Sequence, residues 1–243
     1  MVREYHKWFS QHLDRDMEML VFGHGGARVL VFPTRKGRFF EYENIGCIRC
    51  LEDKIEAGAL QLFCVDSADA DTLYADHHHP QTRIDRHKLY ESYILEEVLP
   101  FTEDNNSHPR LVAHGCSFGA FHSVNIAFRH PDVFKEVVAF SGRYDLTMQV
   151  AHFSDLFSGY YNEDIYFHTP SHFIPNMSDE QILDKLRSMR IVLTIGAEDP
   201  FYHNNASLSH SLSEKQIPHE LYIWDGECHR ASSWRSMVRH YLA

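Results

Sequence analysis

Ser117 lies in the segment Gly115-Cys-Ser117-Phe-Gly119, with a glycine two residues away on each side. This pattern is typical of a serine raised on a sharp turn from a strand into a helix. An apolar run precedes it at residues 111–114, and a helical pattern follows at residues 120–129. Such a turn leaves room only for small neighbours, and the helix N-terminus favours negative charge near the hydroxyl. Ser117 is therefore the candidate nucleophile, and the alternative is a tight turn without chemistry.

A serine nucleophile needs a base to take its proton and an acid to orient that base. In sheets with such a turn, the serine, the acid and the histidine follow one another along the chain, each after a strand. Asp199 follows the apolar run at residues 191–195, and His229 follows the run at residues 220–224. Glu198 is an alternative acid. Three other histidines fit the base less well, because they lie close behind Asp199, before the last strand or within the final helix: His203, His219 and His240.

Two hydrogen-bond donors must stabilise the oxyanion that forms during attack on a carbonyl. One usually follows the nucleophile and the other lies in the loop after the third strand, which here gives the backbone N–H of Phe118 and that of Arg35 or Thr34. His24-Gly-Gly26 has the composition of a known oxyanion loop, but it precedes the third strand. We interpret residues 23–26 as a hairpin turn between the second and third strands, at the opposite edge of the sheet from the serine.

Two further patterns in the sequence could indicate a metal site or a redox pair. Cys47 and Cys50 have the C-x-x-C spacing of a redox pair or of half a zinc site, but they lie in an expected helix and lack a second pair. The run at residues 77–79 consists of three adjacent histidines, whose side chains cannot all face one ion. We interpret these groups as free thiols and a solvated loop, and expect no metal and no cofactor.

The chain is acidic, with 23 Lys and Arg against 34 Asp and Glu among 243 residues and a formal net charge of −11. This balance argues against a nucleic acid or an anionic membrane as the partner. No apolar run approaches the length of about 18 residues that spans a bilayer, and the first residues lack the apolar core of a secretion signal. Five cysteines in a chain of this size favour free thiols. We expect a cytoplasmic location and a small-molecule substrate, and the sequence leaves homo-oligomerisation open.

Short β-rich runs and helical patterns alternate along the chain. Strands are expected at residues 4–10, 18–22, 29–32, 60–65, 111–114, 136–140, 191–195 and 220–224. Helices are expected at residues 86–99, 120–129, 208–215 and 232–242, the first with Leu89, Tyr93, Ile94 and Val98 on one apolar face. The later strands are almost wholly apolar, as in parallel sheets covered on both faces. The pattern predicts one α/β domain over residues 1–243, with a mostly parallel, twisted sheet of about eight strands and helices on both faces.

The residues after the serine resemble the Putative esterase (esterase D-like) branch of the α/β-hydrolases. That branch has a nucleophile helix, an Arg-His-Pro-x-x-Phe turn and a strand ending in Ser-Gly, which here correspond to residues 120–129, 129–134 and 137–142. Its members include S-formylglutathione hydrolases, feruloyl and acetylxylan esterases, enterochelin-type esterases and mycolyltransferases. The order of the strands extends the resemblance to roughly residues 17–243. Pro33-Thr34 departs from the family, whose oxyanion loop often carries His-Gly or Asp-Gly at this point.

The resemblance implies an α/β-hydrolase fold without a large cap domain. Carried over residue by residue, it implies a nucleophile, an acid, a base and two oxyanion donors at Ser117, Asp199, His229, Arg35 and Phe118. We therefore expect a serine carboxylesterase that works through an acyl-enzyme. The alternatives are an acyltransferase with the same triad and a hydrolase fold that only binds.

The long connection at residues 141–189 is rich in aromatic residues. It leaves its strand at the edge of the sheet that also carries the serine, so we expect a partial lid over the site. Phe157, Tyr160 and Tyr161 are the expected substrate contacts. A small, partly covered pocket would favour a short or compact ester. The alternative is a satellite core beneath a long loop.

Overall fold

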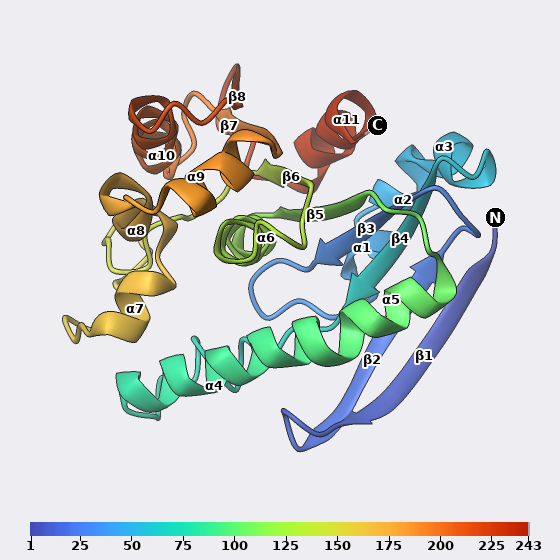
Figure 1. Cartoon of the computed structure of the whole chain (residues 1–243), viewed down its shortest axis with the longest axis horizontal. Helices are drawn as coiled ribbons and strands as arrows, with labels where there is room; N and C mark the ends of the chain where they lie inside the picture. The colour runs from blue at the N-terminus through green and yellow to red at the C-terminus, as the bar shows by residue number, and fades with distance from the viewer. Residues whose placement is uncertain (243) are drawn as a thin grey trace.

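The computed structural model describes residues 1–242, and these contain one eight-stranded sheet (Figure 1). Its strands lie in the order β1-β2-β4-β3-β5-β6-β7-β8, with β1 and β2 antiparallel at one end and the remaining neighbours from β4 onward parallel. The strands are β1 (Arg3–Ser10), β2 (Arg15–Phe22), β3 (Ala27–Phe32), β4 (Leu60–Val65), β5 (Leu111–Cys116), β6 (Glu136–Phe140), β7 (Arg190–Gly196) and β8 (Glu220–Trp224). The mostly parallel sheet confirms the predicted fold class.

Helices cover both faces of the sheet (Figure 1). One face is covered mainly by α4 (Pro80–Tyr93), the π-helical turn η1 (Ile94–Val98), α5 (Leu99–Asn105), α6 (Phe118–Arg129), α8 (Pro170–Asn176), α9 (Glu180–Arg187) and α10 (Tyr202–Glu214). The other face is covered by α1 (Glu41–Asn44), α2 (Cys47–Cys50), α3 (Glu52–Glu56) and α11 (Ala231–Tyr241). A last short helix, α7 (Glu163–Phe167), precedes α8. In the described residues, two large apolar cores result, one on each side of the sheet, and a smaller third cluster forms around Phe118 and Phe157.

The prediction of a hairpin turn at residues 23–26 was wrong. Strand β4 lies between β2 and β3, and Leu62 of β4 pairs with Phe22 on one side and with Val29 on the other. Residues 23–26 therefore cross from β2 over the end of β4 to reach β3. Gly26 is required there, because its φ is +81° and a Cβ would lie 2.3 Å from the carbonyl of Ala59. Local patterns identify strands, whereas pairing depends on the connection that brings β4 back between them.

The first predicted helix also needs correction. It begins at Pro80 and not at residue 86, and Leu89, which we placed on the apolar face, is 45% exposed. The buried face carries His87 and Tyr90 in addition to Tyr93. A pattern of apolar residues alone shows this face only in part, because the polar His87 is buried within it.

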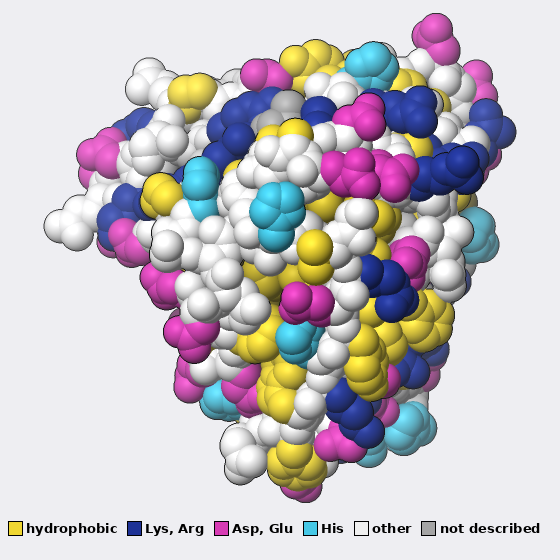
Figure 2. All heavy atoms as spheres, turned by 90° about the vertical axis from the view of Figure 1, so that its right-hand side faces the viewer, with side chains coloured by type: hydrophobic (Ala, Val, Ile, Leu, Met, Phe, Trp, Pro, Cys, Tyr) yellow, Lys and Arg dark blue, Asp and Glu magenta, His cyan; other side chains and the backbone are white. Residues whose placement is uncertain are grey.

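The parallel strands bring several loops to one edge of the sheet. The carboxyl ends of β3, β5, β6, β7 and β8 share this edge, because parallel strands run in the same direction. The candidate residues follow β3, β5, β7 and β8. No helix within residues 1–242 is long and apolar enough to cross a membrane. Seen from the side of β1 and α3, acidic and basic side chains are interspersed on the surface (Figure 2).

Candidate active site

Ser117 occupies a strained turn between β5 and α6. Its φ is 55° and its ψ is −118°, a conformation that residues with a side chain rarely adopt. The two flanking glycines allow the turn. A Cβ at Gly119 would lie 2.2 Å from the carbonyl oxygen of Phe32, and one at Gly115 would lie 2.3 Å from the backbone of Gly119. These contacts explain the spacing of the motif and present the hydroxyl at the carboxyl edge of the sheet.

The structure brings Ser117, His229 and Asp199 into one hydrogen-bonded chain. His229 Nε2 lies 2.9 Å from Ser117 Oγ, and His229 Nδ1 lies 2.9 Å from Asp199 Oδ2. The three side chains come from the loops after β5, β7 and β8, as the sequence predicts. An imidazole that donates from Nδ1 to a carboxylate keeps Nε2 free to accept a proton from the serine.

Asp199 is held where it can orient the histidine. It is 4% exposed, and its second oxygen, Oδ1, accepts a hydrogen bond from the backbone N–H of Phe201 at 2.9 Å. The alternative acid, Glu198, is exposed and has no hydrogen bond to His229. A buried carboxylate with one oxygen fixed by the backbone and the other on an imidazole suits the orienting role.

The other histidines considered as bases lie elsewhere. His203 is exposed beside Tyr202 in α10, and His240 is exposed in α11. His219 precedes β8, where its ring nitrogens contact the Ser209 hydroxyl and the backbone carbonyl of Ile217. None of these side chains shares a hydrogen bond with Ser117 in the described part of the chain.

The oxyanion donors can now be distinguished. The N–H of Thr34 donates to Glu41 Oε2 at 2.7 Å, and its hydroxyl donates to Oε1 of the same carboxylate at 2.6 Å. Thr34 is therefore engaged, which corrects its candidacy as an oxyanion donor. Within residues 1–242, no hydrogen-bond acceptor meets the N–H of Arg35 or of Phe118. Both residues line the cavity that contains Ser117, so they are the better pair.

A cavity of about 280 Å³ opens over the Ser117 hydroxyl. Its lining combines two triad side chains with aromatic walls and two arginines: Thr34, Arg35, Tyr74, Ser117, Phe118, Arg143, Phe153, Phe201, His229 and Trp234. The rings of Phe201 and Trp234 flank His229, with centroids 5.9 and 5.5 Å from the imidazole. Trp234 is itself fixed by a hydrogen bond from Nε1 to the Ser141 hydroxyl. The imidazole is thus enclosed, and its side chain is 16% exposed.

The expected substrate contacts Phe157, Tyr160 and Tyr161 do not line this cavity. Phe157 is fully buried in a cluster with Phe118 and Phe121, which matches the alternative of a satellite core. Tyr160 donates to Gln81 at 2.8 Å, and Tyr161 is 51% exposed. The structure thus places these three side chains outside the cavity at Ser117, because aromatic composition does not tell which rings face a site and which face the core.

Five cavity residues were not among the predicted site residues: Tyr74, Arg143, Phe153, Phe201 and Trp234. Tyr74 belongs to the loop between β4 and α4, Arg143 and Phe153 belong to the connection after β6, and Phe201 and Trp234 flank His229. The sequence did hold a signal for Arg143, since a cation directly after Ser141-Gly142 follows a strand at the edge that carries the serine. The position of Tyr74 had no comparable signal.

The histidines at residues 77–79 and the cysteines Cys47 and Cys50 lie outside the cavity at Ser117. Within residues 1–242, no group of three or more His, Cys, Asp or Glu side chains is arranged to hold a metal ion. His79 caps α4 by accepting a hydrogen bond from the backbone of Gln81. Cys47 and Cys50 are free thiols in α2, and burial raises the pKa of the Cys47 thiol to about 12. A thiol so hard to deprotonate is a poor nucleophile.

Comparison with known proteins gives one family and one fold. The model of the Putative esterase family matches residues 53–236. A ferulic acid esterase superposes with a TM-score of 0.76 at 16% identity, covering 99% of this chain and 96% of the other. An S-formylglutathione hydrolase from Agrobacterium tumefaciens gives 0.77 at 15% identity, with 99% and 92% covered. The enterobactin esterase of Shigella flexneri gives 0.62 at 19% identity, with 98% and 57% covered. No curated protein sequence matches this chain significantly.

Proposed function

The chain belongs to the Putative esterase family, and on this premise we propose that it hydrolyses carboxylic esters with Ser117 as the nucleophile. The family supplies the chemistry of ester cleavage, and the serine mechanism is our inference from the site. One observation carries it: Asp199, His229 and Ser117 form a continuous hydrogen-bonded chain beneath a cavity that Phe118 and Arg35 also line.

Acylation follows from this geometry. Ser117 Oγ attacks the ester carbonyl carbon while its proton passes to His229 Nε2, 2.9 Å away. The imidazolium that forms donates from Nδ1 to Asp199, whose charge stabilises it. The carbonyl oxygen becomes an oxyanion and accepts hydrogen bonds from the N–H groups of Phe118 and Arg35. Collapse of this intermediate breaks the ester bond, and Nε2 returns the proton to the departing alcohol oxygen.

Deacylation repeats the same steps with water. The neutral imidazole of His229 takes a proton from a water molecule that attacks the acyl-serine carbonyl, and the second oxyanion uses the same two N–H groups. Breaking the acyl–Oγ bond releases the carboxylic acid, and Nε2 gives the proton back to Ser117. An alcohol in place of water would transfer the acyl group, so products formed with added alcohol separate hydrolysis from transfer.

The direct test is turnover of short aryl esters by the wild type and by Ser117→Ala. We expect the variant to fold normally and to lose about 10⁴-fold or more in kcat, as removal of a triad nucleophile does. Lys215→Gln serves as a control, because this side chain lies at the far end of α10 from the cavity. Hydrolysis by Ser117→Ala at a rate near that of the wild type would refute the proposal.

A further inference from the structure

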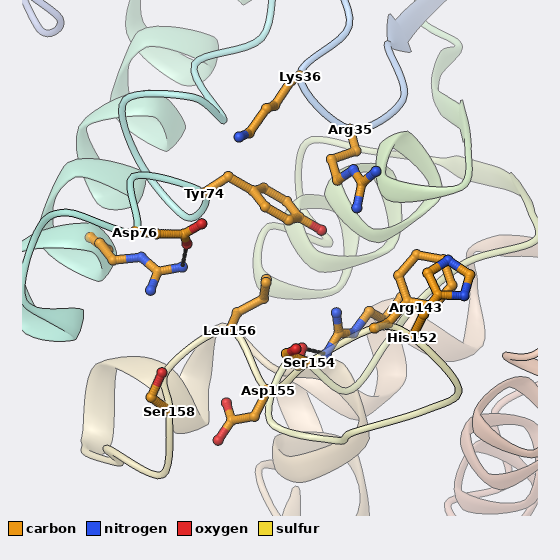
Figure 3. A pocket seen from close by; sticks show the side chains of 12 residues that line it. Arg35, Lys36, Tyr74, Asp76, Arg143, His152, Ser154, Asp155, Leu156 and Ser158 are labelled. Carbon is orange, nitrogen blue, oxygen red and sulfur yellow. Dashed lines mark hydrogen bonds and ion pairs between the residues drawn. The ribbon is translucent and has the colours of Figure 1, made fainter.

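A second cavity of about 550 Å³ adjoins the one over Ser117. The two share Arg35, Tyr74, Arg143 and Phe153 in their linings, so a molecule held at the serine can extend into the second space. This cavity lies between the loop after β3, the loop before α4 and the connection after β6 (Figure 3). Its volume falls within the usual range for small-molecule sites, which is about 300–1,000 Å³.

The lining of the second cavity is cationic although the chain as a whole is acidic. Four side chains are basic and two are acidic: Arg35, Lys36, Arg83 and Arg143 against Asp76 and Asp155. Both acids are already engaged. Asp76 pairs with Arg83 at 3.3 Å, and the Asp155 carboxylate accepts hydrogen bonds from the backbone of Phe157 and Gly159. Asp155 keeps its charge, so four cations against two carboxylates leave the lining with a formal net charge of +2.

Arg143 is the most informative of these cations. It is 4% exposed, and its Nε and Nη2 donate to backbone carbonyls, among them that of Ser154 at 2.7 Å. No carboxylate of the described residues pairs with it. Figure 3 shows one guanidinium nitrogen turned from Ser154 toward the centre of the cavity, where the Tyr74 hydroxyl also points. A buried charge that is held by neutral groups, with the Tyr74 hydroxyl beside it on the cavity side, is suited to an incoming anion.

Arg35 and Lys36 stand on the opposite side of this space. Both cations lie over the ring of Tyr74, with Arg35 Cζ 5.7 Å and Lys36 Nζ 5.6 Å from its centroid. In residues 1–242, neither side chain has a carboxylate partner, whereas most other Lys and Arg side chains are held by a carboxylate or a carbonyl. The ring of Tyr74 in turn contacts Phe118, the residue after the nucleophile, with centroids 5.0 Å apart. The cations thus lie about one aromatic ring away from the reacting centre.

We infer that the ester taken by this site carries an anionic group, a carboxylate or a phosphate, which extends from Ser117 into the cavity lined by Arg35, Lys36 and Arg143. This inference rests on the proposed serine mechanism and adds the substrate class. A carboxylate or phosphate offers several acceptor oxygens, and the cavity offers guanidinium, ammonium and hydroxyl donors on two sides. An uncharged ester of the same size would leave these donors without partners, at a cost in binding.

The experiment compares matched esters. On the acyl side, para-nitrophenyl esters of pentanoate and of glutarate differ only in a terminal methyl or carboxylate. On the alcohol side, we compare butanoate esters of three phenols that carry a hydrogen, a carboxylate or a phosphate at the meta position. This series also separates a preference for carboxylate from one for phosphate. We expect kcat/KM to be about tenfold higher for the anionic member on at least one side. Raising the salt to about 0.5 M should reduce this preference, because the cations of Arg35 and Lys36 are exposed.

Two variants tie the preference to the cations. Lys36→Gln should lower the ratio of anionic to neutral kcat/KM about two- to fivefold. Arg143→Gln should abolish most of it, with urea unfolding as the check on its fold. Lys215→Gln, a lysine remote from the cavity, should leave the ratio unchanged. Equal kcat/KM for both members of every pair, or a preference that survives in both cavity variants, would overturn the inference alone. Absence of Ser117-dependent hydrolysis of every ester would instead overturn the proposed function.

Discussion

Asp199→Asn tests the orientation of the base, and its effect can be worked out from the site. In the wild type, Asp199 Oδ2 accepts a hydrogen bond from His229 Nδ1–H, and Oδ1 accepts one from the Phe201 amide. Asparagine has the same shape and keeps an oxygen for Phe201, so the amide nitrogen must face the imidazole. That nitrogen donates, which forces Nδ1 to accept and moves the imidazole proton to Nε2. Nε2 then can no longer take the proton of Ser117.

This change should lower kcat by about 10³- to 10⁴-fold, which corresponds to about 4–5.5 kcal/mol in the activation free energy. The assay is the initial rate of aryl ester hydrolysis under saturating conditions, with KM expected to change little. Glu198→Gln is the matched control, because it makes the same chemical change on the exposed neighbour and should keep kcat within about twofold. A loss of less than tenfold in Asp199→Asn, or a larger loss in Glu198→Gln, would refute the reasoning.

Three further changes probe the rest of the molecule. Gly119→Ala places a methyl group 2.2 Å from a backbone carbonyl and should cost about 3 kcal/mol in urea unfolding, while Gly25→Ala, which meets open space, should cost little. Burial lowers the pKa of His114 to about 4, below its ordinary value of 6.5. The folded state therefore resists protonation, and the free energy of unfolding should fall by about 3 kcal/mol as the pH drops from 6.5 to 4; equal urea midpoints at both ends of this range would contradict the assignment. Phe153→Ala, at the cavity wall, should raise KM for aryl esters about three- to tenfold, whereas Tyr160→Ala should leave it unchanged; the opposite result would return the substrate contact to Tyr160.

The catalytic candidates could be predicted from the sequence because each one is marked by residues next to it in the chain. The turn at Ser117 needs glycines at fixed spacing, and Asp199 and His229 each follow an apolar strand whose end lies at the same edge. Parallel strands convert these separate positions in the chain into one place in space. The strands themselves were predictable for the same reason, because an apolar run buried on both faces is a strong local signal.

What the sequence did not disclose depends on how the chain packs, which local patterns of residues do not encode. The insertion of β4 between β2 and β3 follows from the path of the connection, so residues 23–26 were misread. Thr34 is a plausible oxyanion donor by its place in the sequence, but in the structure its N–H donates to Glu41, seven positions later. Phe157 and Phe153 are four positions apart, yet one faces a core cluster and the other faces the cavity. Amino-acid composition cannot distinguish these two rings, because their surroundings are set by the packing of the folded chain.

Ser117 Oγ should form the covalent acyl-enzyme, and labelling with an aryl phosphonate ester followed by peptide mass spectrometry tests this role most directly. The phosphorus accepts the activated serine oxygen as a carbonyl carbon would, and the adduct hydrolyses too slowly to be lost. We expect one adduct per chain, located on Ser117 and absent from Ser117→Ala. An adduct on another residue, or continued ester hydrolysis by fully labelled protein, would contradict it.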